Sequence, residues 1–479
     1  MNEPPRMTEP PGMTADPLPA LREIAGEAWL VGGAVRDRLL GRPTADFDVA
    51  VGGEPRRVAR ALARATRAHP FALSEGFGGW RVVAHDHRWQ VDVLPVAGGA
   101  IEADLANRDF TVNAIAEPLH GGRYIDPFGG VQDLRHRRLR MVASQVFAAD
   151  PLRTLRLARL ACELDFEIDA ATAAAARAGA PALAEVAAER VFTELKRIVA
   201  CDRPLRGLDL LDALRATDVV LPELSALRGV EQSQFHHLDV HDHTRLVLAE
   251  TLALERDPGH RFGEHGEAVS ELLAEPLAND LTRGQALRIG ALLHDIAKPQ
   301  TRAVTPEGRV TFLGHDVAGA ELAGAVLGRL RASQRLAVHV AALVRHHLEL
   351  GFLVPEMPLG RRPIYRYLRD CDPVQVDVTV LSVADRLATR GRGSERAIAR
   401  HLELARQMLA EALRWRRARP APPVRGHELA RALRLAPGPD LGWMLAELEE
   451  ASFAGEIASR DEALARAREL ISSRRAADR

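Results

Sequence analysis

The chain has 479 residues, which is too many for a single hydrophobic core and predicts several domains. Hydrophobic residues make up 47% and charged residues 27%, which fits a globular protein and excludes a largely disordered chain. The net charge of −1 excludes a uniformly basic surface, so any nucleic-acid-binding surface must come from local patches.

Cysteine usage and hydropathy indicate the compartment. Cys162, Cys201 and Cys371 are too far apart in the sequence for a CxxC metal site or a disulfide framework. No uninterrupted apolar run reaches the roughly 18 residues that span a bilayer. We therefore expect a cytoplasmic location with no membrane partner, and no sequence feature predicts the oligomeric state.

The N-terminal half is predicted to contain a tail, a head and a neck. Residues 1–20 are Pro-rich and polar, lack the apolar core of a signal peptide, and are predicted to form a disordered tail. Residues 21–148 alternate short apolar runs with turns, which predicts a mixed α/β head with strands at "DFDVAV", "WRVVAH" and "WQVDVLPV". From residue 149 apolar residues recur at helical spacing, so residues 149–225 are predicted to be a helical neck.

The C-terminal half is predicted to be helical throughout. A histidine-rich body covers residues 226–413. The stretch "RWRRARPAPPVRGHEL" is basic and then Pro-rich, and it is expected to be a linker that opens a helical tail over residues 414–479. The expected fold class is α+β, with a small α/β head before a mostly helical neck and body.

Two carboxylates, Asp46 and Asp48, lie where the "DFDVAV" strand is expected to begin. Alternate strand residues point to the same face, about 7 Å apart along the strand, so these carboxylates repel unless a cation lies between them. Mg²⁺ suits oxygen ligands, and paired ions steady the attacking and leaving oxygens of phosphoryl chemistry. Asp92, on another predicted strand, is expected to complete this catalytic metal site.

A glycine pair precedes the carboxylates. Gly32 and Gly33 lead into a helix expected to begin near Ala34, so backbone N–H groups and the helix N-terminus can hold a phosphate, with Arg36 nearby. Taken alone, the glycine pair is an ordinary turn and the D-x-D a solvated strand end. The combination is more specific for nucleotide chemistry.

The segment "LVGGAVRDRLLGRPTADFDVAV" resembles the first motif of the class II tRNA nucleotidyltransferase (CCA-adding) and bacterial poly(A) polymerase family. "RDFTVNAIA", "DPFGGVQDL" and "DPLRTLRLARL" resemble its second, third and fourth motifs, in the family's order. The resemblance implies a small polymerase-β-like nucleotidyltransferase head before a helical neck and body. It also implies a tRNA 3′ end and CTP, with ATP as an alternative, as partners.

The resemblance implies a role for each matched residue. The physical case is clearest for Asp150 and Arg153, because carboxylate and guanidinium can read the Watson–Crick edge of a base from positions i and i+3 of one helix. The alternative for Asp150 is a helix N-cap before Pro151. The implied metal ligands are Asp46 and Asp48, and the implied nucleotide-binding residues are Gly32, Gly33, Arg36, Arg108, Asp109, Asn113, Asp150, Arg153, Arg156 and Arg159.

The chain departs from the family pattern at several points. Asn107 replaces a usual arginine and Ala149 a frequent glutamate. The stretch Leu94–Phe110 is shorter than the loop of members that complete CCA, and resembles members that add only the two cytidines. The basic signature of poly(A) polymerases is missing, with "EGFGGWRVVAH" in its place, which argues against that activity.

The body resembles the HD phosphohydrolase superfamily. Imidazole and carboxylate suit Ni²⁺, Mn²⁺, Fe²⁺ or Zn²⁺, and a His-Asp pair inside an apolar helix is costly to bury unless it is paired or metal-bound. Lys298 is implied to face a substrate phosphate, and the alternative is an HD fold without activity. The implied metal ligands are His243, His294, Asp295 and Asp385, with His315 and His346 (or His347) as additional ones.

The sequence thus predicts a nucleotidyltransferase that adds C, as CC or CCA, to the 3′ end of tRNA without a nucleic-acid template. A metal-dependent phosphohydrolase activity in the HD body is expected beside it. The alternatives are an HD phosphohydrolase with a vestigial head, a poly(A) polymerase, or an RNA-binding protein without catalysis. The D-x-D argues against a pure binding role, which has no need of such repulsion.

Overall fold

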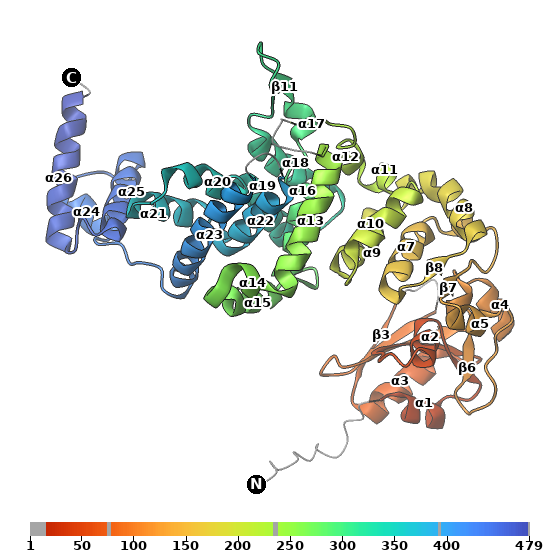
Figure 1. Cartoon of the computed structure of the whole chain (residues 1–479). Coiled ribbons are helices and arrows are strands. Elements are labelled where there is room, and N and C mark those ends of the chain that lie inside the picture. The colour runs from red at the N-terminus through yellow and green to blue at the C-terminus, as the bar shows by residue number, and fades with distance from the viewer. Residues whose placement is uncertain (1–15, 74–77, 233–237, 391–393, 478–479) are drawn as a thin grey trace, which may run out of the picture. The chain divides into compact units, whose positions relative to one another are not determined.

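The computed structural model describes residues 16–73, 78–232, 238–390 and 394–477, and the chain divides into two compact units, Met1–Val220 and Leu221–Arg479 (Figure 1). Most of the predicted N-terminal tail lies outside the described residues. However, helix α1 (Leu18–Ile24) begins within it, because Leu18 and Leu21 are buried. The tail prediction therefore extended too far.

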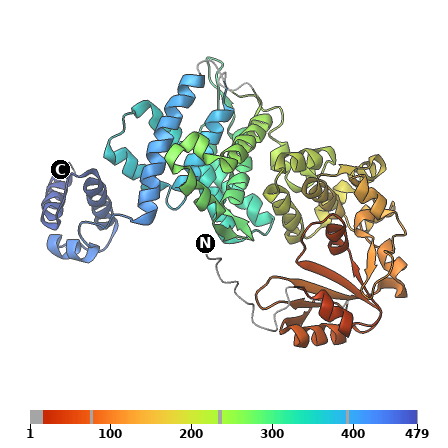
Figure 2. The same ribbon diagram turned by 60° about the horizontal axis from the view of Figure 1, so that its bottom comes forward.

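The first unit contains a six-stranded sheet in the order β3-β4-β5-β2-β1-β6, seen from two directions in Figures 1 and 2. Strand β2 pairs in parallel with β5 and antiparallel with β1. The strands predicted at "DFDVAV", "WRVVAH" and "WQVDVLPV" are confirmed. Strand β3 was not predicted, because all its residues are exposed and give no alternating pattern. The strands are β1 (Ala28–Val31), β2 (Asp46–Val51), β3 (His69–Ala72), β4 (Trp80–Val83), β5 (Gln90–Pro95) and β6 (Ala116–Pro118).

Helices cover this sheet and place its central strands. The buried side of α3 (Pro55–Thr66), including Val58 and Leu62, packs against β3, β4 and β5. Helix α2 (Gly33–Leu39) follows β1 directly and contacts β2. The remaining helical pieces of the head are η1 (Ala97–Gly99), α4 (Ile101–Ala106), η2 (Thr111–Asn113), α5 (Gly130–Arg135) and α6 (Val146–Ala149).

The neck is helical, as expected, and centres on α7 (Arg153–Leu164). Leu155, Leu157 and Leu160 of α7 are fully buried, and its neighbours are α9 (Ala188–Ala200) and α10 (Pro204–Ala213). A short parallel pair, β7 (Arg138–Leu139) with β8 (Glu167–Ile168), lies beside α7. Helices α8 (Ala170–Gly179) and α11 (Thr217–Val220) and the turn η3 (Ala180–Glu185) complete the unit.

The second unit is built around two helices that are buried on nearly all sides, α16 (Arg283–Leu293) and α22 (Gln375–Ala388). A helix that is apolar all round belongs in a core, and the neighbouring helices supply the polar outer surfaces. Those helices are α12 (Pro222–Ser225), α13 (Val240–Arg256), α14 (Pro258–Phe262), α15 (Gly266–Ala274), α17 (Lys298–Thr301), α18 (His315–Arg329), α19 (Gln334–His346), α20 (Glu349–Leu353), α21 (Arg361–Asp370) and α23 (Ser394–Arg417). The short turns η4 (Gly263–His265) and η5 (Val354–Glu356), and two hairpins, β9 (Pro276–Ala278) with β10 (Leu281–Thr282) and β11 (Ala303–Val304) with β12 (Val310–Thr311), complete it.

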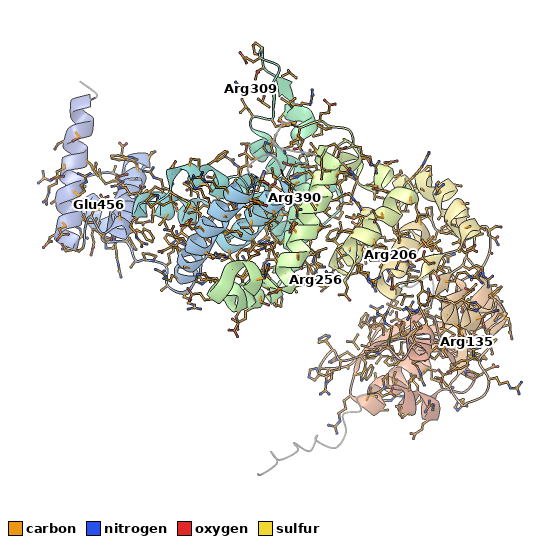
Figure 3. The ribbon with its side chains drawn as sticks, in the orientation of Figure 1. Arg135, Arg206, Arg256, Arg309, Arg390 and Glu456 are labelled. Carbon is orange, nitrogen blue, oxygen red and sulfur yellow. The ribbon has the colours of Figure 1, made fainter. Side chains whose placement is uncertain are left out.

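The predicted linker begins later than expected. Helix α23 runs to Arg417 and buries Trp415, so "RWRR" is helical and only the Pro-rich part lies outside a helix. Helices α24 (Gly426–Leu433), α25 (Pro439–Ala454) and α26 (Arg460–Ala477) then form a core of their own. Glu456, labelled in Figure 3, ties this group to α21 through an ion pair with Arg362.

One segment, Gln334–Glu356, has the length and the mean hydropathy, 1.2, of a membrane-spanning helix. In the structure it is divided among α19, α20 and η5, and it supplies core residues such as Leu343 and Leu350. Packing inside the second unit therefore accounts for part of its apolar character, since 39% of its most apolar stretch is buried.

Candidate functional site

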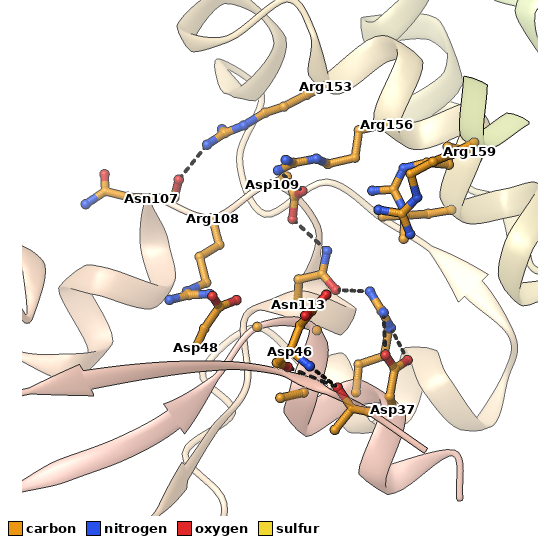
Figure 4. Close-up of a pocket in the computed structure, with 17 residues that line it drawn as sticks. Asp37, Asp46, Asp48, Asn107, Arg108, Asp109, Asn113, Arg153, Arg156 and Arg159 are labelled. Atoms are coloured by element: carbon orange, nitrogen blue, oxygen red, sulfur yellow. Dashed lines mark hydrogen bonds and ion pairs between the residues drawn. The ribbon is translucent and has the colours of Figure 1, made fainter. Parts of the chain in front are cut away.

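A polar cavity of about 400 Å³ lies in the first unit (Figure 4). It lies between helix α7 and the N-terminal end of β2, which carries Asp46 and Asp48. It gathers the D-x-D, the glycine turn and the arginines of α7, as the motifs predicted. Among the predicted head residues, the cavity lining includes Gly32, Gly33, Arg36, Asp46, Asp48, Arg108, Asp109, Asn113, Arg153, Arg156 and Arg159, but neither Asp92 nor Asp150.

Gly32 brings the turn after β1 against the carboxylate centre. Its φ of 70° lies in the left-handed region, which favours glycine. A Cβ built at Gly32 would lie 2.8 Å from Asp48 Oδ2 and 2.8 Å from Arg108 Nη1. The conformation therefore favours glycine, and a side chain here would also displace the ends of the Asp48 and Arg108 side chains.

The carboxyl group of Asp48 is harder to ionise than an ordinary aspartate. Burial raises its pKa, and the charges of Asp92 and Asp46 raise it further, while Arg108 lowers it. Arg108 is itself held by Asp104, whose Oδ2 accepts from Nε at 3.1 Å and from Nη2 at 3.0 Å. A divalent cation would relieve this repulsion, so the donor set fits the Mg²⁺ that the sequence predicts.

Asp92 is held differently from the other two carboxylates. It lies opposite Asp48 in the parallel register of β2 and β5, as a third metal ligand would require. However, both its oxygens accept from Arg81 of β4, at 2.6 and 2.7 Å. Sequence reasoning missed Arg81, although the two residues are cross-strand partners of neighbouring strands.

A chain of hydrogen bonds joins Arg36, which follows the glycine turn, to α7. Arg36 Nη1 donates to Asn113 Oδ1 at 2.8 Å, and Asn113 Nδ2 donates to Asp109 Oδ1 at 2.9 Å. Arg156 Nη1 then donates to Asp109 Oδ2 at 3.2 Å. Burial opposes the ionisation of Asp109, but Arg156 and Asn113 more than offset it and lower its pKa. Contacts within the protein thus hold Arg36, Asn113, Asp109 and Arg156 in one network.

Two acidic residues that sequence reasoning missed hold the arginines of α7. Glu194 of α9 is 5% exposed; it accepts a hydrogen bond from Arg159 and lies 3.6 Å from Arg156 Nε. Glu163 accepts from Arg159 Nη1 at 2.7 Å. The sequence did contain a signal for Glu194, because this glutamate lies on the apolar face of "ERVFTELKRIVA" and a buried charge needs a partner.

Asp150 does not lie where the sequence argument placed it. Helix α7 begins at Arg153, so Asp150 and Arg153 are not i and i+3 of one helix. Asp150 Oδ1 accepts from Leu152 N at 3.3 Å, and Oδ2 accepts from Arg190 at 2.8 Å. Asp150 is not the N-cap of α7 either, since that residue is Leu152; its carboxylate accepts from the backbone of the turn just before the helix.

A second cluster lies in the second unit, centred on Asp295. Its Oδ2 lies 3.1 Å from His294 Nε2 and 3.7 Å from His243 Nε2, and its Oδ1 lies 3.3 Å from His315 Nε2. Asp385 Oδ1 lies 3.0 Å from His243 Nε2. Helices α13, α18 and α22, with the turn that follows α16, thus bring together residues that are up to 142 positions apart, from 243 to 385.

The histidine tautomers in this cluster point to a cation. His294, His315 and His347 each donate Nδ1–H to the carbonyl three residues earlier, at 2.7 to 2.8 Å. In the neutral rings Nε2 is then unprotonated, and it faces the oxygens of Asp295. Among the described residues, the buried Nε2 atoms of His294 and His315 make no hydrogen bond. A metal ion satisfies such inward-facing acceptors, and the carbonyls orient the rings for it.

Of the two alternatives for the additional ligand, the structure places His347 in the cluster. His347 is 1% exposed, and its Nε2 lies 3.9 Å from Asp295 Oδ1. His346 turns elsewhere, with its Nδ1 3.7 Å from Glu349, so its assignment as a ligand is corrected to His347. Two adjacent residues near a helix end point in different directions, which sequence spacing did not resolve.

Lys298 lies at the cluster, as predicted. Its Nζ is 2.7 Å from Asp295 Oδ2 and donates to Gln232 Oε1 at 2.7 Å. Gln232 was not predicted, because it precedes the histidine motifs without a pattern of its own. These two contacts hold Lys298 beside the cluster.

The α/β head with a D-x-D at its central strand defines a nucleotidyltransferase, and the buried His-Asp cluster defines an HD body. Residues 28–140 match the family model "Poly A polymerase head domain", residues 165–227 "Probable RNA and SrmB- binding site of polymerase A", and residues 262–390 "HD domain". The chain belongs to the tRNA nucleotidyltransferase and poly(A) polymerase family.

Two relatives match along nearly the whole chain. The A-adding tRNA nucleotidyltransferase of Deinococcus radiodurans is 38% identical over 454 residues, which is 93% of this chain and 96% of the relative. The CC-adding tRNA nucleotidyltransferase of Thermus thermophilus is 34% identical over 447 residues, 92% of each chain. A solved structure titled "The structure of CCA-adding enzyme apo form I" shares the fold, with a TM-score of 0.63 at 18% identity over 95% of this chain and 93% of the other.

Proposed function

We propose that this chain adds cytidine or adenosine to the 3′ end of tRNA in the cytoplasm, without a nucleic-acid template. The observation that carries the proposal is the cavity in which the D-x-D, the Gly32 turn and the α7 arginines meet. Its volume suits a nucleotide, and its lining suits phosphate, ribose and base in that order from β2 to α7.

Different residues of the head would bind the metal ions and the triphosphate. Asp46 and Asp48 would hold Mg²⁺, which supplies charge stabilisation at the attacking 3′ oxygen and the leaving pyrophosphate. The backbone N–H groups of the Gly33 helix start and the Arg36 guanidinium bind the triphosphate. Arg108, placed against Gly32 and Asp48, orients the α-phosphate.

The base would meet α7. Arg156 is positioned by Asp109 and Glu194, and Arg153 Nη2 donates to the Asn107 carbonyl at 2.9 Å. Fixed guanidinium groups can donate to the Watson–Crick edge of a base. The protein itself would then select the nucleotide.

We propose further that the chain adds only part of CCA. The stretch from β5 to Arg108 is taken up by η1 and α4, and Leu105 of α4 is fully buried. This stretch therefore has a packed role of its own and is short, as in members that add the two cytidines. The likeness to an A-adding relative over 93% of this chain favours addition of the final adenosine as a second candidate.

The test is extension of tRNA at single-nucleotide resolution with Mg²⁺. One substrate ends before CCA and the other ends in CC, and each is given CTP, ATP or both. Two C residues on the first substrate and no product on the second support CC addition. A single A on the second substrate alone supports A addition, full CCA contradicts the partial reaction, and no product on either contradicts the nucleotidyltransferase proposal.

A second activity, metal-dependent hydrolysis of phosphate esters by the HD body, is supported by the inward-facing Nε2 atoms around Asp295. His243, His294, Asp295 and Asp385 would hold a transition-metal ion, which supplies an activated water at neutral pH. Lys298 would bind the phosphate. Hydrolysis of a nucleoside 2′,3′-cyclic phosphate with Mn²⁺ or Ni²⁺, lost in Asp295→Asn, tests this; equal rates in both proteins would contradict it.

A further inference from the structure

The outer side of helix α3 in the head carries a row of arginines. They recur at three- and four-residue spacing, which places them on one side of the helix, and the last of them is its C-cap. All of them are exposed, whereas the apolar residues of α3 are buried against the sheet. We call this set the basic face of α3; its members are Arg56, Arg57, Arg60, Arg64 and Arg67.

The positive charge of the basic face is not compensated. Helix α3 contains no acidic residue, and Glu54 lies before it, as its N-cap. Among the residues that the structure describes, no carboxylate forms an ion pair with any of the five arginines. Exposed arginines of the neck are used differently, since Arg190 pairs with Asp150 and Arg203 with Asp165. The basic face is therefore a local positive surface on a chain of nearly zero net charge.

Trp80 of β4 holds part of the basic face in place. The guanidinium groups of Arg56 and Arg60 lie 5.7 and 5.6 Å from the centroid of its ring. Such cation–π contacts restrict two long side chains that would otherwise lose rotamer freedom on binding. The surface is thus partly ordered for an anionic partner.

The basic face lies on the opposite side of the sheet from the proposed catalytic carboxylates. Trp80 and Arg81 are adjacent on β4, so their side chains point to opposite faces. Arg81 binds Asp92 on the carboxylate side, and Trp80 contacts α3 on the other. No residue of α3 lines the cavity, and α3 lies outside residues 165–227, which match the RNA-binding family model. The basic face is therefore separate from both.

We propose that the basic face of α3 is an additional RNA-binding surface, which binds the phosphate backbone at a place separate from the cavity. From Arg57 to Arg67 the helix rises about 15 Å, with a guanidinium about every 5 Å. Guanidinium groups bind phosphate oxygens through paired hydrogen bonds, so an open row of them fits a chain of phosphates. Such contacts position a nucleic acid without reading its sequence.

The composition of α3 favours RNA over an anionic membrane as the partner. A helix that lies on a bilayer inserts an apolar face into it. Here the apolar face is already packed against the sheet, and Ala65 is the only exposed apolar residue of α3. The inference does not rest on nucleotide addition, because backbone binding needs neither the metal ligands nor the cavity.

The experiment measures binding of the full chain to a fluorescent oligouridylate whose 3′ end carries a phosphate and cannot be extended. Affinity is followed over a range of salt concentrations. The charge-removing variant combines Arg57→Gln, Arg60→Gln and Arg64→Gln, and the charge-retaining variant has Lys at the same three positions. The matched control combines Arg123→Gln, Arg302→Gln and Arg309→Gln, which are exposed arginines outside α3.

We expect the charge-removing variant to bind RNA more weakly and with a smaller salt dependence. Each phosphate contact on a single strand contributes about 0.7 to the slope of log K against log salt, so loss of three should reduce that slope by about two. The charge-retaining variant and the matched control should keep the slope of the natural chain. Equal thermal midpoints in all four proteins verify that the fold is unchanged.

Three results would overturn the inference. The first is an equal slope in the charge-removing variant and the matched control. The second is an equal loss in the charge-retaining variant, which would show that altered packing rather than charge is responsible. The third comes from sedimentation with phosphatidylglycerol vesicles: weaker vesicle binding with an unchanged RNA slope would assign the basic face to a lipid surface. Because the RNA cannot be extended, none of these results bears on nucleotide addition.

Discussion

At Gly32 one missing side chain decides the geometry of the proposed nucleotide site. The residue has positive φ, and the space that a Cβ would take is filled by Asp48 and Arg108. Asp92 is a second example, because its hydrogen bond from Arg81 limits how far its carboxylate is available to a metal ion. At this scale function depends on which atoms stand within about 3 Å of each other.

Gly32→Ala should lower nucleotide addition by about a hundredfold, because a displacement of roughly 1 Å at the reacting centre costs that much. The thermal midpoint should change far less than the activity. Gly53→Ala is the matched control, since no atom lies within 4 Å of a Cβ built at Gly53. Steady-state rates on a truncated tRNA check this, and equal rates in the two variants would contradict it.

Asp92→Asn should reduce kcat less than Asp48→Asn does, because Arg81 already occupies both oxygens of Asp92. Loss of a metal ligand removes several kcal/mol of charge stabilisation, so Asp48→Asn should cost about a thousandfold or more. A double-mutant cycle on Arg81 and Asp92 should show coupling between them. If Asp92→Asn is as damaging as Asp48→Asn, Asp92 is a direct ligand.

At the scale of elements, α7 presents its arginines because α9 holds them. Glu194 comes from the neighbouring helix and lies between Arg156 and Arg159. In the head, Asp133 of α5 plays a similar part, since its oxygens accept from Thr111 of η2 and from Arg138 and Arg140 around β7. Glu194 and Asp133 thus hold neighbouring elements in positions that the sequences of those elements do not determine by themselves.

Glu194→Ala should destabilise the first unit by about 3 kcal/mol, because it leaves the buried Arg159 without its closest partner. It should also raise KM for the nucleotide, since Arg156 loses one of its two acids. Glu185→Ala, an exposed glutamate of η3, serves as the control. Denaturant titration and KM measurements check both effects, and a change in neither would exclude the positioning role.

Asp133→Asn should make stability less dependent on pH. Burial opposes ionisation of Asp133, but the hydrogen bonds from Thr111, Arg138 and Arg140 lower its pKa. A lowered folded-state pKa stabilises the fold above the unfolded value of about 3.9, and this contribution is lost as pH falls through the folded value. We therefore expect the thermal midpoint to drop by about 5 °C at pH 7.

The difference between Asp133→Asn and the natural chain should stay constant from pH 8 to about 5 and shrink below about 4. Glu185→Gln, an exposed acid with no such network, should show no difference across the range. A difference in thermal midpoint that is the same at every pH would mean that Asp133 acts through packing alone.

At the scale of the whole molecule, each of the two units contains one of the two proposed sites. The head cavity belongs to Met1–Val220 and the His-Asp cluster to Leu221–Arg479. Asp46→Ala should therefore abolish nucleotide addition and leave ester hydrolysis intact, and Asp295→Asn should do the reverse. Parallel assays of both activities check this, and loss of both in either variant would show that the sites are coupled.

Metal removal should destabilise the second unit. An ion held at a hundred times its dissociation constant contributes about 2.7 kcal/mol to a folded state. Chelation followed by addition of Mn²⁺ or Ni²⁺ should therefore lower and then restore one thermal transition in the natural chain. In Asp295→Asn the metal should have little effect, and a full response in that variant would contradict the site.

The sequence by itself determined the α+β class, the central strands and helices, and the D-x-D, glycine-turn and histidine motifs, because these depend on local periodicity and short spacing. The sequence did not determine which other residues hold the side chains of these motifs in place. Arg81, Glu194 and Gln232 approach from other strands, helices or loops, and the choice of His347 over His346 depends on how α19 ends. Those partners are separated in sequence, and only the packing of helices and strands brings their side chains within bonding distance.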